Sequence, residues 1–180
     1  MILTYQECIE KYGSDYKIKK EIENRNLFMM EKGVYSTEEI APELDIILNK
    51  YPKTVCTGPS AFYYHGLTDV IPDYYYLATK RNDTRIKDLR VKQSFLKDDI
   101  FEPGTIEIEY NNSTVRLYGK ERMIIELMRF KSRTPNDYYK EIIRNYRKLV
   151  NELDFRLVED YAALFPNGSK YMDMIEIEVL

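Results

Sequence analysis

The sequence predicts an α+β protein, and three observations support that class. Apolar residues recur at helical spacing near the start of the chain and again over residues 120–178. Short runs that favour β-strands fill much of residues 54–118 between them. The chain has 180 residues, of which 44% are apolar, so it can bury a substantial core.

The first helix has clear signals at both ends. Thr4 and Glu7 have the spacing of a capping box, in which each side chain accepts a hydrogen bond from the other's backbone N–H. Leu3 and Cys8 flank that start with the spacing of a hydrophobic staple. Gly13 is expected to end the helix, because glycine accepts a left-handed conformation without strain.

A second helix and a hairpin are predicted directly afterwards. Ser14 is the expected N-cap of that helix, and Ile18 and Ile22 give it an apolar stripe. The apolar runs 27–30 and 34–35 flank a glycine-bearing turn, which predicts a β-hairpin. Helix, tight turn, helix and hairpin is the order of a winged helix-turn-helix. We therefore predict a shortened winged helix-turn-helix over residues 1–36.

Residues 37–180 are predicted to form a mixed domain with a small β-sheet, at about 54–118, and a helical C-terminal half, at about 120–178. A helix from Ser36-Thr37 to Lys50 leads into it. The expected strands cover residues 54–57, 73–79, 91–96, 105–110 and 114–118, and a short helix carries residues 61–65. The C-terminal helices are expected at residues 120–131, 136–150, 153–164 and 168–178.

Composition excludes several classes of function. One histidine and two separated cysteines rule out zinc fingers and multi-histidine metal sites, so we expect no metal and no cofactor. We also expect a cytoplasmic protein without a membrane partner, since no apolar run is long enough to span a bilayer and no secretory leader is apparent.

Charge is unevenly distributed along the chain, although the formal net charge is only −3. Residues 80–97 carry seven basic and two acidic side chains, and residues 120–148 carry nine basic and four acidic ones. Residues 152–180 are acidic, with seven acids against two basic residues. The basic segments are either solvated faces or an electrostatic footprint for nucleic acid or an acidic partner.

Several stretches match one family pattern. They are residues 12–16 and 31–35, residues 60–69 with the sequence SAFYYHGLTD, Ile71-Pro72, and residues 118–129. Together they resemble the AbiEi-type antitoxins of type IV toxin–antitoxin systems, which are linked to abortive phage infection. The residues that carry the family signature are Ser60, Tyr64, His65, Gly66, Glu121 and Arg122.

The resemblance implies an antitoxin that is also a transcriptional autorepressor, and not an enzyme. Its expected partners are operator DNA with inverted repeats and a nucleotidyltransferase-like toxin, which it counters directly or only functionally. The alternative is a protein-interaction module that neutralises a toxin without reading DNA. Residues 1–35 contain six basic and six acidic side chains, and this local neutrality favours the alternative.

In such a fold, the second helix and the hairpin tip would meet DNA. The candidate DNA-binding residues are Ser14, Tyr16, Lys17, Lys20, Asn24 and Lys32. A lysine in the major groove can address guanine and an asparagine adenine, whereas Lys32 at the tip would contact phosphate.

We expect no catalytic residue. Ser60 and His65 are five positions apart, which turns their side chains about 140° from each other on a helix and makes a direct dyad poor. His65 is expected to be a structural residue hydrogen-bonded at a helix end, and Arg122 to form an internal ion pair or to face a partner. Asp69 and Asp73 weakly match a nucleotidyltransferase pattern, but they lack the spacing for two metals on one strand.

Overall fold

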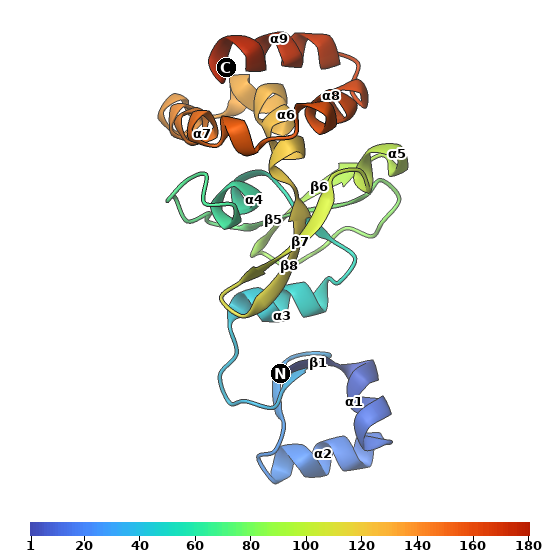
Figure 1. Cartoon of the computed structure of the whole chain (residues 1–180). Helices are drawn as coiled ribbons and strands as arrows, with labels where there is room; N and C mark the ends of the chain where they lie inside the picture. The colour runs from blue at the N-terminus through green and yellow to red at the C-terminus, as the bar shows by residue number, and fades with distance from the viewer. The chain divides into compact units, whose positions relative to one another are not determined.

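The computed structural model describes residues 1–180 and confirms the predicted α+β class, with nine α-helices and two β-sheets. The chain divides into two compact units, which are unit 1 (Met1–Thr54) and unit 2 (Val55–Leu180). Figure 1 labels the helices of both units and the strands β1, β5, β6, β7 and β8.

Unit 1 contains three strands and three helices. In chain order they are β1 (Ile2–Thr4), α1 (Tyr5–Tyr12), α2 (Asp15–Glu23), β2 (Phe28–Glu31), β3 (Val34–Ser36) and α3 (Glu43–Lys50). The strands form one antiparallel sheet of order β1-β3-β2. The predicted hairpin is confirmed as β2 and β3, and β1 adds a third strand to it.

The predicted boundaries of the first two helices are confirmed. The Thr4 N–H donates to Glu7 Oε2 at 2.7 Å, and the Glu7 N–H donates to Thr4 Oγ1 at 3.3 Å, which completes the capping box. Gly13 ends α1 with φ 88°. Between the two helices and the sheet lies a small core of buried side chains, formed by Leu3, Cys8, Ile18, Leu27 and Tyr35.

Two features of unit 1 differ from the sequence prediction. Strand β1 was not expected, because three residues give no clear pattern and their partner lies far along the chain, with Ile2 opposite Ser36. The predicted helix start at Ser36-Thr37 is wrong, because Ser36 belongs to β3 and α3 begins at Glu43. Pro42 sits at the N-cap of α3, and a proline disfavours helical backbone in the residue before it.

The division between the units falls later than the boundary expected near Ser36. Helix α3 packs against β1 and β3, so it belongs to the same compact unit as the first sheet. The reason is tertiary packing rather than composition, since the sequence around Thr54 contains no linker-like run.

Unit 2 is built on a mixed five-stranded sheet. Its strands are β4 (Val55–Cys56), β5 (Tyr75–Lys80), β6 (Val91–Leu96), β7 (Thr105–Tyr110) and β8 (Ser113–Tyr118), in the order β6-β5-β4-β8-β7. The pairs β5–β6 and β4–β8 are parallel, whereas β4–β5 and β7–β8 are antiparallel. Asn111 and Asn112 join β7 to β8 with positive φ at both positions, as a two-residue hairpin turn requires. All the predicted strand regions of this unit are confirmed.

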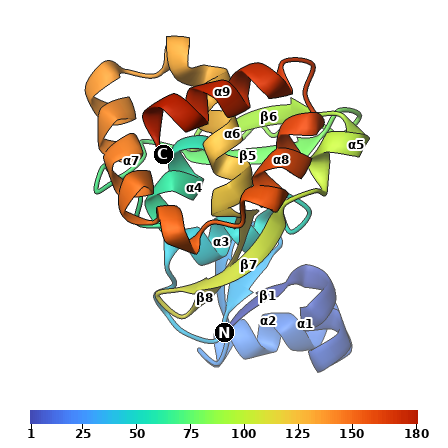
Figure 2. The same ribbon diagram turned by 45° about the horizontal axis from the view of Figure 1, so that its top comes forward.

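The helices of unit 2 are α4 (Gly58–Tyr64), α5 (Asp98–Phe101), α6 (Lys120–Phe130), α7 (Asn136–Lys148), α8 (Phe155–Ala163) and α9 (Gly168–Glu178). The four predicted C-terminal helices are thereby confirmed, with slightly shifted ends. Helix α6 lies between α7 and α8 in both ribbon views, and it packs against α4, α8 and α9 (Figures 1 and 2). Because α6 is central, its residues from Arg122 to Met128 are all buried.

No helix in the structure combines the length and the apolar character that crossing a membrane requires.

Candidate nucleic-acid interface

Helix α2 carries most of the predicted DNA contacts, and two side chains fix its start. Ser14 caps it, with its Oγ accepting a hydrogen bond from the Lys17 N–H at 3.4 Å. The Tyr5 hydroxyl of α1 donates to Asp15 Oδ1 at 2.8 Å, and this hydrogen bond raises the pKa of Tyr5. Helices α1 and α2 are therefore joined by a polar contact as well as by the apolar core.

The candidate residues of α2 gather on one exposed face. Ile18 points into the core with 3% of its surface exposed, and Ile22, four residues on, packs against the same core. Tyr16, Lys20 and Asn24 also follow each other at intervals of four, so they form a stripe on the opposite side of the helix. Tyr16 is 74% exposed, and Lys20 and Asn24 are exposed too.

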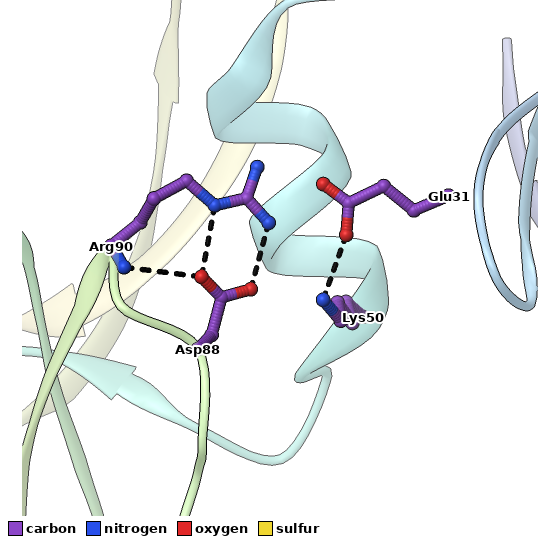
Figure 3. A network of polar contacts seen from close by, with 4 residues as sticks. All are labelled: Glu31, Lys50, Asp88 and Arg90. Atoms are coloured by element: carbon purple, nitrogen blue, oxygen red, sulfur yellow. Dashed lines mark hydrogen bonds and ion pairs between the residues drawn. The ribbon is translucent and has the colours of Figure 1, made fainter.

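Acidic side chains of unit 1 are largely engaged in local contacts. Glu7 belongs to the capping box and Asp15 accepts from Tyr5, as described above. Glu21 accepts from Asn26 Nδ2 at 2.9 Å. Glu31 of β2 pairs with Lys50 of α3 at 2.7 Å (Figure 3). The exposed lysines Lys17, Lys20 and Lys32 have no ion pair. Four of the six acidic side chains of residues 1–35 are therefore engaged in local contacts, whereas these three lysines carry unpaired charge.

Lys32 lies in the turn of the β2–β3 hairpin, next to Gly33. It is exposed, as the prediction of a hairpin-tip contact requires. Gly33 has φ 84°, a conformation that favours glycine, and the backbone carbonyl of Gly33 accepts a hydrogen bond from the Tyr5 N–H at 3.0 Å. The start of α1 thereby holds the hairpin turn that presents Lys32.

Ser60 joins α4 to the strand beside it. Its buried Oγ donates to the Tyr74 carbonyl at 3.3 Å and accepts from the Tyr76 N–H at 2.9 Å. The hydroxyl thus satisfies backbone groups at the start of β5, which gives Ser60 a structural role.

Tyr64, near the end of α4, belongs to a cluster of tyrosines. Its ring packs edge-on against Tyr110 of β7, with 4.9 Å between the ring centroids, and against Tyr63 at 5.7 Å. Burial raises the pKa of Tyr64 far above its ordinary value, so the phenol stays protonated at every physiological pH.

His65 and Gly66 form the end of α4. His65 Nε2 lies 2.7 Å from the backbone carbonyl of Tyr118, so the ring donates from Nε2–H. Burial lowers the pKa of His65, which keeps the imidazole neutral. Gly66 follows with φ 67°. Ser60 and His65 are therefore bound to different backbone groups and do not form a catalytic pair.

Arg122 of α6 is fully buried, and its ionic partner is Glu126. The Arg122 Nε and Nη2 atoms donate to Glu126 Oε1 at 3.2 and 3.0 Å, and the guanidinium lies 4.6 Å from the Phe165 ring centroid. Arg129 Nη1 donates to the other carboxylate oxygen at 2.5 Å. Of the two outcomes expected for Arg122, the structure therefore shows the internal ion pair.

Glu121, at the start of α6, accepts a hydrogen bond from the Asp154 N–H at 3.3 Å, next to the start of α8. This contact ties two helices together. The signature residues of unit 2 thus make structural contacts to backbone groups, rings or a buried ion pair.

Part of the basic segment 120–148 is engaged within the protein, whereas Arg133, Lys140 and Arg144 are exposed. Arg122 is buried, Lys131 forms an ion pair with Glu178, and Arg147 Nε donates to the Glu178 carbonyl at 2.7 Å. Lys131, at the end of α6, and Arg147 of α7 thereby contact α9.

The basic segment 80–97 contains a well-held loop between β5 and β6. Gln93 of β6 accepts from the Ile86 N–H at 2.7 Å and donates to Thr79 Oγ1 at 2.8 Å. Asp88 binds the Arg90 guanidinium through both carboxylate oxygens, at 2.9 and 2.7 Å (Figure 3). The exposed cations of this loop are Arg81, Arg85 and Lys87.

Sequence reasoning missed Glu126 and Arg129, the partners that complete the buried network around Arg122. Their signal was present, since Arg122, Glu126 and Arg129 have the i, i+4, i+7 spacing of one helix face. Burial of that face could not be foreseen, because it depends on α8 and α9 packing over it.

The structure contains no group of three or more histidine, cysteine, aspartate or glutamate side chains that could hold a metal ion. A scan against protein-family models and a search of curated proteins both found no match to this chain.

Proposed function

We propose that this chain is a DNA-binding transcriptional repressor that acts as the antitoxin of an AbiEi-type system, without catalytic activity. Support comes from the order β1-α1-α2-β2-β3 and from the sheet in which the first strand pairs with the returning hairpin. A strand before the two helices and a hairpin after them suit a winged helix-turn-helix. In such a fold α2 is the recognition helix.

The exposed face of α2 is the observation that carries the proposal. Tyr16, Lys20 and Asn24 form its stripe, Lys17 lies at its N-terminal end, and the core residues Ile18 and Ile22 occupy the opposite side. A helix held by its other face and exposing unpaired lysines suits insertion into the major groove.

Each candidate residue has a defined role in this proposal. Lys17 and Lys20 donate to the O6 and N7 atoms of guanine, and Asn24 pairs with N6 and N7 of adenine. Lys32 contacts phosphate, so it contributes affinity without sequence information. The Arg81, Arg85 and Lys87 side chains add a second, salt-sensitive phosphate contact.

A second candidate function is toxin neutralisation through protein contacts alone. Val70 and Ile71 favour it, because these adjacent apolar side chains are 51% and 72% exposed in the loop before β5. Exposed apolar residues that lie together are typical of protein interfaces. A partner that bound there would need no DNA.

The test is a fluorescence-anisotropy titration of the full chain against the DNA upstream of its own gene and against a scrambled duplex. We expect preference for the upstream DNA and a steep loss of affinity between about 50 mM and about 200 mM salt. A folded protein that binds neither duplex, or both equally, would overturn the repressor function and leave the protein-interaction function.

A further inference from the structure

Unit 2 contains a cavity of about 360 Å³ that has no part in the proposed function. It is lined by β5 and β6, the start of α4, the second half of α6 and the connection into α7. Its volume falls within the roughly 300–1,000 Å³ that ligand pockets occupy.

Aromatic rings form much of the cavity wall. Phe62 and Tyr76 line it from α4 and β5, and Phe130 lines it from the end of α6. Phe130 is 43% exposed, which is high for so large an apolar side chain. Flat apolar walls with an exposed ring suit a planar, aromatic ligand.

Tyr138 of α7 adds a hydrogen-bond donor to this wall. Its hydroxyl is buried and has no hydrogen-bond partner within the protein. Burial raises the pKa of Tyr138, so the hydroxyl keeps its proton and remains a donor. A buried hydroxyl without a partner costs free energy, and a ligand acceptor would remove that cost.

Glu126 supplies an acceptor in the same cavity. The side chain is 6% exposed, and its two oxygens accept hydrogen bonds from Arg122 and Arg129. Oε2 receives one of the bonds shown, from Arg129, and a carboxylate oxygen can accept two.

Two cations lie beside these groups. Arg133 lines the cavity, is exposed and has no ion pair. Lys92 of β6 is opposite Tyr76 in the parallel register, so both side chains point to the same face of the sheet. The Lys92 Nζ atom lies 4.3 Å from the Tyr74 ring centroid. The cavity is therefore adjacent to positive charge that an anionic ligand would neutralise.

We propose that this cavity binds a nucleotide. The base packs against Tyr76 and Phe130, its exocyclic amino group donates to Glu126, and a ring or carbonyl acceptor of the base receives the Tyr138 hydroxyl. The phosphate lies at Arg133, with Lys92 nearby. The same chemistry is present in a free mononucleotide and in a base of single-stranded nucleic acid.

The test is isothermal titration calorimetry of the full chain with CMP, AMP, GMP and UMP. We expect saturable binding of at least one amino-bearing nucleotide, with UMP weaker. No saturable heat with any of the four would overturn the proposal. Equal binding of UMP would overturn the assignment of Glu126 as the acceptor for the amino group.

Tyr138→Phe removes only the unpartnered hydroxyl, so the fold should survive. We expect it to weaken binding of the best nucleotide about tenfold, equivalent to roughly 1.4 kcal/mol. Tyr171→Phe, on α9 outside the cavity, is the matched control and should bind as the wild type does. Unchanged affinity of Tyr138→Phe would contradict the proposed contact.

Arg133→Gln tests the phosphate contact. The wild type should prefer the nucleotide over its nucleoside, and the variant should lose that preference, whereas Arg144→Gln on the exposed face of α7 should keep it. A preference that survives in Arg133→Gln would contradict the assignment.

A five-nucleotide single strand identifies the source of the ligand. Tighter binding of the strand than of the mononucleotide indicates nucleic acid, whereas equal or weaker binding indicates the free nucleotide. These readouts are independent of duplex binding by α2.

Discussion

Arg122 and Glu126 form the most deeply buried ion pair of unit 2, with side chains that are 0% and 6% exposed. Removal of one member leaves the other charge uncompensated in the interior. We therefore predict that Glu126→Gln lowers the free energy of unfolding by about 3–5 kcal/mol, measured by urea denaturation followed by circular dichroism. The exposed Glu159→Gln change on α8 is the control. A loss below about 1 kcal/mol for Glu126→Gln would show that the pair contributes little.

The lone histidine gives stability a specific pH dependence. Burial lowers the pKa of His65 from its ordinary 6.5, so the unfolded chain binds a proton more readily than the folded one. The stabilisation is therefore fully present above the unfolded-state pKa of 6.5, and it is lost as the pH falls from there through the lower pKa of the folded state. We predict that stability decreases from about pH 7.5 to about pH 5.5 and that His65→Gln reduces this decrease.

Because the chain has one histidine, the His65→Gln comparison isolates its contribution. Urea unfolding of both proteins at the two pH values provides the measurement. An identical pH dependence in wild type and variant would contradict a buried, neutral His65.

For single residues, the sequence predicted the kind of contact that a side chain makes better than it predicted the partner in that contact. One histidine at a helix end was enough to expect a structural hydrogen bond, but its acceptor, the Tyr118 carbonyl, lies 53 positions away. The same limit applies to Ser60, whose bonds to Tyr74 and Tyr76 depend on how α4 meets β5. Long-range partners follow from tertiary packing, which no local pattern records.

Among the elements, the junction of α8 and α9 makes the sharpest prediction. A Cβ on Gly168, the first residue of α9, would lie 2.3 Å from the Ala162 carbonyl oxygen. Alanine favours helices over glycine by about 1 kcal/mol, but this backbone clash outweighs that gain. We predict that Gly168→Ala destabilises the protein by about 1–3 kcal/mol, measured by urea unfolding.

The neighbouring change Ser169→Ala, at an exposed position of the same helix, should have little effect. A Gly168→Ala variant as stable as the wild type would mean that α9 can move away from α8 without cost.

Elements with local signals were predicted well. The capping box of α1 and the Asn111-Asn112 turn are each determined by a few adjacent residues. Strand β1 was missed because it exists only through its pairing with β3. The late start of α3 was missed because the residues between the end of β3 and Pro42 do not enter the helix. For a strand as short as β1, pairing with a distant strand determines the structure more than the local sequence does.

For the whole molecule, the sequence predicted two domains, but the first compact unit extends to Thr54 instead of ending near Ser36. The difference comes from α3, whose amphipathic pattern does not reveal which sheet it covers. The candidate interface on α2 could be located from sequence, since helical spacing alone places Tyr16, Lys20 and Asn24 together. The cavity of unit 2 could not, because its lining comes from segments spread over residues 57–138.

The two units have separate roles in these proposals. Unit 1 presents the proposed reading helix, whereas the signature residues of unit 2 are held in structural contacts. Loss of duplex binding therefore leaves the nucleotide cavity intact, and loss of nucleotide binding leaves α2 intact. The two proposals can fail independently.

The central claim is that α2 reads base edges, and the ratio of affinities for upstream and scrambled DNA tests it most directly. The ratio is measured for the wild type, for Lys17→Ala/Lys20→Ala and for the charge-matched control Lys53→Ala/Lys170→Ala. Each lysine–guanine contact is worth about 1–3 kcal/mol of discrimination. We predict a wild-type ratio of at least about tenfold that falls toward one in Lys17→Ala/Lys20→Ala and persists in the control. An unchanged ratio in Lys17→Ala/Lys20→Ala would contradict the claim.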